Sequence, residues 1–128
     1  MKWIECLADL IFPRKCEICG RLLTGDERYI CEDCMEDMPL TYYWDWPENP
    51  AEKKLWVRTH LHRVIPLFFY TRESRYITLI HKIKYQGKAH LGHYMGFMLG
   101  EKLRGVLSDV DYVVPIPLHP IRRWRRGY

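Results

Sequence analysis

Four cysteines in two closely spaced pairs constrain this chain more than any other feature. Cys16 and Cys19 are separated by two residues, and Cys31 and Cys34 repeat that spacing after eleven intervening residues. Each pair lets two thiolates reach one ion at about 2.3 Å, and two pairs complete a tetrahedral site with no open coordination position. The spacing therefore predicts a structural zinc site in which the metal holds the fold and performs no chemistry.

Two disulfide bonds are the first alternative to a metal site. Disulfides persist in oxidising compartments, so a secreted protein would be expected to carry a signal peptide. The first apolar run is too short and too charged for one, because it contains Glu5 and Asp9. A cytoplasmic location and a metal site are the better expectation.

A redox-active cysteine pair is the second alternative. Such a pair normally occurs once and beside a βαβ pattern. Here the pair occurs twice, with Gly20, Gly25 and Asp26 between the two copies, as expected of a hairpin-like loop. The fifth cysteine, Cys6, lies on an amphipathic stretch and is expected to be a buried apolar side chain rather than a ligand.

Positive charge is concentrated near the C-terminal end. The chain has a formal net charge of +4, and Arg122, Arg123, Arg125 and Arg126 alone supply four positive charges. The remainder is formally neutral, which indicates a local basic segment rather than a nucleic-acid-binding surface spread over the whole protein.

Composition and periodicity divide the chain into three parts. Residues 1–40 are expected to hold an N-terminal helix, over residues 2–12, and the zinc-binding module. Residues 41–62 have neither helical nor strand periodicity and are interpreted as an irregular linker. Their aromatic side chains could form a base-stacking platform, but the lack of interleaved basic residues favours packing against the next domain. No apolar run has transmembrane length, so no membrane insertion is expected.

Residues 63–128 have the pattern of an α/β domain. The apolar run 64–70 predicts a strand, which Pro66 places at a sheet edge. Helical periodicity follows over 73–84, with Gly87 as the stop, and over residues 89–106. The near-continuous apolar run 111–117 is typical of a strand buried on both faces of a parallel sheet.

The arginine-rich segment after that strand predicts a phosphate or pyrophosphate site. Ligands of open α/β sheets bind beyond the carboxyl ends of strands, and guanidinium groups offer paired donors that match two phosphate oxygens. A solvated basic tail is the alternative. Pro115, Pro117 and Pro120 favour the binding site, because proline fixes the backbone where a loop must be preorganised.

Several motifs in order resemble the ComF family, competence-associated bacterial proteins related to type I phosphoribosyltransferases. They are the double cysteine knuckle, the Lys84-Tyr85-Gln86-Gly87 turn, the DYVVPIPLHP run over 111–120 and the final Arg126-Gly127-Tyr128. The resemblance implies a zinc-ribbon-like module followed by the first part of a type I phosphoribosyltransferase-like parallel sheet domain. It also implies that phosphoribosyl pyrophosphate (PRPP) binds with magnesium.

By this resemblance and the charge pattern, the phosphate or pyrophosphate site is expected to use residues from the turn over 84–87 and from the segment 117–127. They are Lys84, Tyr85, Gly87, Pro117, His119, Arg122, Arg123, Arg125, Arg126 and Gly127.

The sequence also departs from that family. Members continue past the Arg-Gly-aromatic motif into further strands and an acidic-acidic-x-x-Thr-Thr-Gly loop that cradles the ribose 5-phosphate. These 128 residues contain no such loop, so the expectation is a truncated chain that is catalytically incomplete, with no identifiable catalytic residue or acceptor. The rival hypothesis is a zinc-dependent adaptor without enzymatic activity, binding single-stranded DNA or DNA-uptake proteins. A purely structural zinc scaffold is the third possibility.

Overall fold

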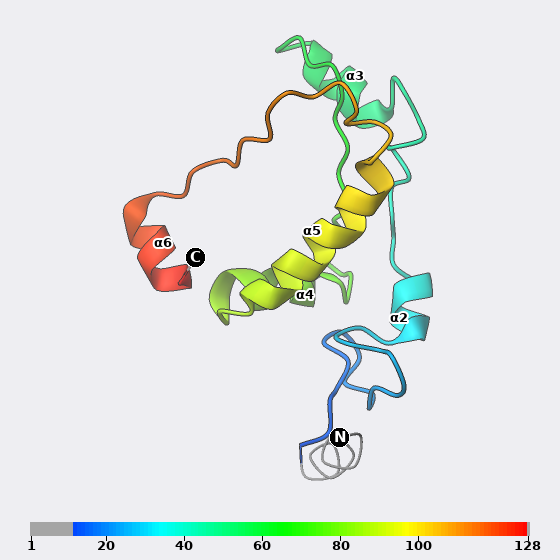
Figure 1. The fold of residues 1–128 in the computed structure, drawn as a ribbon, viewed down its shortest axis with the longest axis vertical. Coiled ribbons are helices and arrows are strands. Elements are labelled where there is room, and N and C mark those ends of the chain that lie inside the picture. The colour runs from blue at the N-terminus through cyan, green and yellow to red at the C-terminus, as the bar shows by residue number, and fades with distance from the viewer. Residues whose placement is uncertain (1–11, 128) are drawn as a thin grey trace.

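The computed structural model describes residues 12–127, so the helix predicted over residues 2–12 and the environment of Cys6 lie outside the described part. Within it the chain forms helices joined by irregular segments (Figure 1). They are α2 (Glu32–Glu36), α3 (Pro50–Trp56), α4 (Ile77–Tyr85), α5 (Ala89–Leu103) and α6 (Pro120–Arg126).

Helices α4 and α5 form a helical hairpin at the centre of the molecule (Figure 1). Gly87 ends α4 with a φ of 66°, the left-handed conformation that glycine adopts without steric cost. Leu79 and Leu91 are fully buried, and the side chain of Ile83 lies close to Gly92. The two helices and the glycine stop predicted from periodicity are confirmed, although α4 begins at residue 77 rather than 73 and α5 ends at residue 103.

The cysteine module packs directly on this hairpin. Tyr76, at the start of α4, donates its hydroxyl hydrogen to the backbone oxygen of Cys34 at 3.0 Å. One continuous buried cluster contains residues from both parts: Cys16, Leu23, Ile30, Cys31, Cys34, Met38, Tyr76, Leu79, Leu91 and Met95. The metal module and the helical hairpin therefore share a single hydrophobic core.

The predicted linker contains a helix, which corrects the expectation of an irregular segment over residues 41–62. Asn49 and Glu52 form a complete capping box at the start of α3, and Pro50 occupies its first turn. The Glu52 side chain is 1% exposed. It accepts hydrogen bonds from Arg63 Nε at 3.0 Å and the Val64 amide at 3.1 Å. One buried carboxylate thus connects the start of α3 to residues 63 and 64.

Two of the aromatic residues before α3 pack in the interior, as the sequence predicts, whereas Tyr42 is 58% exposed. Tyr43 and Trp44 are buried. The ring of Tyr43 meets those of Trp46 and Phe69 edge to face, each at a centroid distance of 5.7 Å. Trp46 is itself about half exposed.

The strand predicted over residues 64–70 is reduced to one isolated bridge, between Leu40 and Phe68. The Phe69 amide donates to the Pro39 oxygen at 2.8 Å, and the Thr41 amide donates to the Leu67 oxygen at 3.2 Å. Proline has no amide hydrogen, so Pro39 and Pro66 cannot donate to a longer ladder. Among residues 12–127 the other bridge joins Lys15 and Leu22 within the cysteine module.

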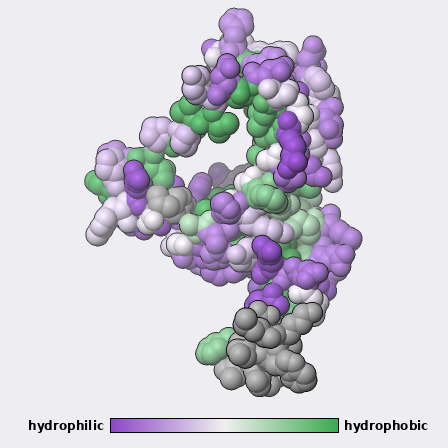
Figure 2. Space-filling model, viewed as in Figure 1, coloured by the Kyte–Doolittle hydropathy of each residue, from purple (hydrophilic) through white to green (hydrophobic). Residues whose placement is uncertain are grey.

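The strand predicted over residues 111–117 is also not formed, and the parallel sheet is not supported. These residues are extended but exposed, with Val113, Val114 and Ile116 at 84%, 80% and 93% exposure. A buried strand requires neighbours that bond its backbone, and no described segment pairs with this one. In the space-filling view the extended segment borders an opening in the molecule (Figure 2). It leads into α6, where a loop was predicted.

Replacing Glu52 by Ala should lower the free energy of unfolding by roughly 3 kcal/mol, because removing one partner of a buried ion pair leaves the other uncompensated. Arg63 retains 21% side-chain exposure, which places the expected loss at the lower end for such pairs. Urea denaturation of the zinc-loaded protein measures this change. Lys53→Ala, an exposed substitution on the same helix, should change stability by less than about 0.5 kcal/mol. Equal midpoints for the two variants would contradict the account.

Candidate metal centre and basic cavity

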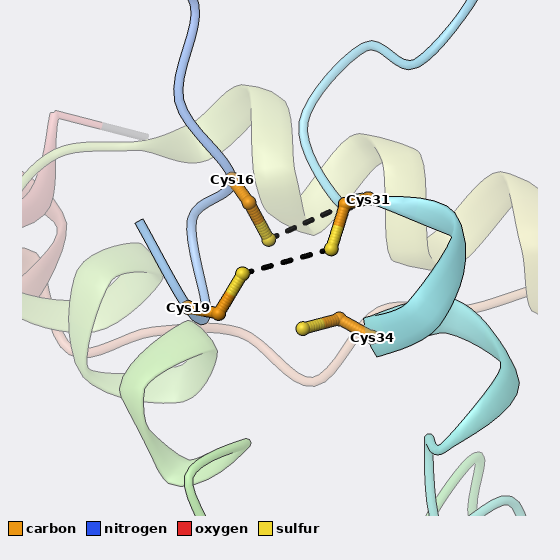
Figure 3. Close-up of side chains that lie close together, drawn as sticks. All are labelled: Cys16, Cys19, Cys31 and Cys34. Carbon is orange, nitrogen blue, oxygen red and sulfur yellow. Dashed lines mark hydrogen bonds between the residues drawn. The ribbon is translucent and has the colours of Figure 1, made fainter. Parts of the chain in front are cut away.

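The four predicted ligands meet at one point. The Sγ atoms of Cys16, Cys19, Cys31 and Cys34 all lie within 4.8 Å of one another, and their side chains converge (Figure 3). The Cys19 and Cys31 sulfurs are 3.6 Å apart. Four sulfurs at about 2.3 Å from a tetrahedral zinc ion would be separated by about 3.8 Å. The arrangement therefore fits a zinc ion with little adjustment.

Each cysteine pair is positioned by a local backbone turn. In the first, the Gly20 amide donates to the Cys16 oxygen at 2.9 Å, and a φ of 77° at Gly20 turns the chain back. In the second, Cys31 is the N-cap of α2 and Cys34 lies inside that helix. Both turns are encoded locally, which is why the spacing alone predicted the site.

The surroundings of the four sulfurs shift the thiol pKa values in opposite directions. Burial opposes ionisation of Cys16, but amide hydrogens of Cys19, Cys31 and Ile18 outweigh it and lower the pKa of Cys16 to about 6. Burial raises the pKa of Cys31 and of Cys34. Four thiolates cannot share this volume without a positive ion, whereas zinc deprotonates coordinated thiols outright. Zinc bound here would contribute to the folding free energy. With four thiolate ligands it would have no open coordination position for catalysis.

The loop between the two pairs is braced by a second group of polar contacts. The Glu27 carboxylate accepts hydrogen bonds from the Thr24 amide at 2.7 Å and the Glu32 amide at 2.8 Å. Arg21 forms ion pairs with both Glu27 and Asp33. These contacts join the segment before α2 to the start of α2 and hold the two cysteine pairs in register.

A basic cavity of about 410 Å³ lies between the end of α4 and α6. Its lining residues are Lys84, Tyr85, Arg122, Arg125 and Arg126. The arginines are spaced i, i+3 and i+4 on α6, so they lie on one helical face. The structure thus brings together five residues of the predicted phosphate site from segments more than 35 residues apart.

The other predicted phosphate residues do not line this cavity. Gly87 lies in the turn after α4, and Pro117 lies in the extended segment. His119 is the N-cap of α6 and makes no side-chain cap bond, while Gly127 ends α6 with a φ of 81°. Arg123 follows Arg122 by about 100° around the helix and is not among the residues that line the cavity. These glycines and the proline shape the backbone.

Helix α6 is the feature that sequence reasoning missed at this site. Proline at a first helical position and glycine just past the last one are a known pair of helix signals. Pro120 and Gly127 hold those positions and could have predicted the helix.

Comparison with known families identifies the N-terminal module. Residues 7–43 match the family described as the double zinc ribbon domain. This range contains the four ligand cysteines and no other cysteine or histidine, which agrees with a single tetrahedral site. No curated protein and no solved structure matched the chain. None of the described helices is long and apolar enough to span a membrane.

The purified protein should contain about one zinc ion per molecule, because the four thiolates complete one closed site. Metal analysis of protein expressed with ample zinc measures this. Cys34→Ser should lose most of the zinc, since it replaces a buried sulfur ligand. Less than about half an equivalent in the unmodified protein, or full zinc retention in Cys34→Ser, would contradict the assignment.

Proposed function

We propose that this chain is ComF-like and related to the type I phosphoribosyltransferases, and that its basic cavity receives the pyrophosphate group of PRPP. The observation that carries the proposal is the meeting of two sequence-distant basic segments at one cavity. Lys84 and Tyr85 come from the end of α4, and the three arginines come from α6. The ComF resemblance involves both of these segments.

The charge of the cavity favours a multiply charged anion. Four of its five lining residues are cationic and none is acidic. No ion pair recorded between described residues engages these four cations. Arginine offers paired donors that match phosphate oxygens, and lysine adds a compact charge. The volume of about 410 Å³ is within the range of small-molecule sites.

In phosphoribosyl transfer, the bond from the anomeric carbon of PRPP to pyrophosphate breaks, and an acceptor nucleophile forms the new bond to that carbon. The leaving pyrophosphate takes the electron pair and accumulates negative charge. Guanidinium groups aimed at the leaving group would stabilise that charge, and this is the role proposed for the α6 arginines. Magnesium would arrive with PRPP, because no carboxylate lines the cavity.

A nucleic-acid adaptor is the second candidate, and exposed aromatic residues favour it. Trp124 on α6 is 85% exposed, and Tyr85 is 73% exposed. Proteins that bind single strands combine aromatic stacking with a positively charged groove. The competence association of the ComF family agrees with this role.

Replacing Arg126 or Lys84 by Ala should weaken binding of inorganic pyrophosphate by roughly 1.5 to 3 kcal/mol, because each substitution removes a charge-assisted hydrogen bond. Isothermal titration calorimetry of the full chain measures the affinity. Arg123→Ala is the matched control: it removes the same charge from the same helix but does not touch the cavity. It should change the affinity much less.

Equal losses from Arg123→Ala and Arg126→Ala would indicate general charge attraction and contradict a built site. Tight binding of single-stranded DNA with a steep salt dependence, together with no pyrophosphate binding, would favour the adaptor instead.

A further inference from the structure

We propose that Glu17 is a positioning residue that ties the turn between α4 and α5 to the zinc module and thereby places Lys84 and Tyr85 at the basic cavity. Glu17 lies inside the first cysteine pair, directly after Cys16. The role assigned to it rests on the proposed function, because the cavity is its target.

One carboxylate holds two lysines that bracket the turn. Lys82 Nζ lies 2.8 Å from Glu17 Oε2 and 2.7 Å from the Glu17 backbone oxygen. Lys88 Nζ lies 2.7 Å from both carboxylate oxygens. Lys82 is in the last turn of α4 and Lys88 is the N-cap of α5. Glu17 therefore joins both helix ends to the first cysteine turn.

These ion pairs are partly buried. The side-chain exposure is 14% for Glu17, 21% for Lys82 and 34% for Lys88. Exposed ion pairs contribute little because water and salt screen them, whereas partly buried pairs are screened less. The ion pairs of Glu17 are therefore expected to contribute more to stability than the surface pair of Arg104 and Glu101.

The helical geometry relates this connection to the cavity. Successive residues of an α-helix are rotated by about 100°, so Lys84 is about 200° around α4 from Lys82. Lys82 contacts the zinc module, and Lys84 lines the basic cavity. Anchoring Lys82 on one side of α4 thus sets the direction of Lys84 on the other side.

The opposite end of α4 is tied to the same module. The Tyr76 hydroxyl donates to the backbone oxygen of Cys34, which lies in the second cysteine pair. Each end of α4 is thus held by a different cysteine pair, Tyr76 by the second and Lys82 by the first. A helix held in this way cannot rotate without breaking a contact to the metal module.

The test compares Glu17→Gln with Glu36→Gln, which changes an exposed carboxylate on α2 in the same module. Three quantities are measured in the full chain: zinc content, pyrophosphate affinity and amide exchange over residues 82–88. Glu17→Gln should retain zinc, bind pyrophosphate about three- to tenfold more weakly and exchange faster in the turn. Glu36→Gln should match the original protein, and Glu17→Asp should recover part of the affinity.

A double substitution separates positioning from general destabilisation. If Glu17 acts by directing Lys84, then Lys84→Met should cost less affinity in the Glu17→Gln protein than in the original one. Additive losses would overturn the positioning role. Loss of zinc from Glu17→Gln would overturn it as well, because Glu17 would then be required by the metal site itself.

Failure of the proposed function gives a different result. If the original protein does not bind pyrophosphate, the assignment of the cavity fails, and amide exchange alone then decides the role of Glu17. Faster exchange over residues 82–88 in Glu17→Gln, but not in Glu36→Gln, supports the connection. Unchanged exchange in both variants overturns it.

Discussion

Four sulfur atoms must share one small volume that is buried except on the Cys19 side, and the rest of the described structure depends on that requirement. Cys31 and Cys34 are completely buried, and Cys16 nearly so. A buried thiolate without a compensating charge is costly, so a bound cation would stabilise the folded module. Cys16, Cys31 and Cys34 pack in one cluster with Leu79 and Leu91 of the helical hairpin. We therefore expect zinc binding and hairpin packing to be parts of one folding event.

The basic cavity depends on this core indirectly. One wall comes from the end of α4, which is held on the zinc module by Glu17 and by the Tyr76 hydroxyl. The other wall comes from α6, which follows an extended segment with little burial. The α4 wall is thus the fixed side of the cavity. The α6 wall carries three arginines, and the Lys84 charge on the α4 wall repels them. An anion between the two walls would offset this repulsion and stabilise the approach of α6 to α4.

The features predicted correctly from sequence are those encoded by short-range patterns. The cysteine spacing predicts the ligands, and Gly87 marks the end of α4. The prediction of a parallel sheet was wrong because strand formation depends on residues far apart in the sequence. Residues 111–117 have the composition of a buried strand but no paired neighbour among the described residues. Helix α3 was missed although Asn49 and Glu52 form a local capping signal. The contact from Glu17 to lysines 65 and 71 residues away has no local sequence signal.

Hydrogen exchange with and without zinc tests the shared core most directly. The amides of α4 and α5 should be protected in the zinc-loaded protein and should lose that protection together with the cysteine module after chelation, because metal removal exposes the sulfurs that pack against Leu79 and Leu91. Retained protection of α4 and α5 after complete zinc removal would contradict the account, since the hairpin would then be stable without the metal.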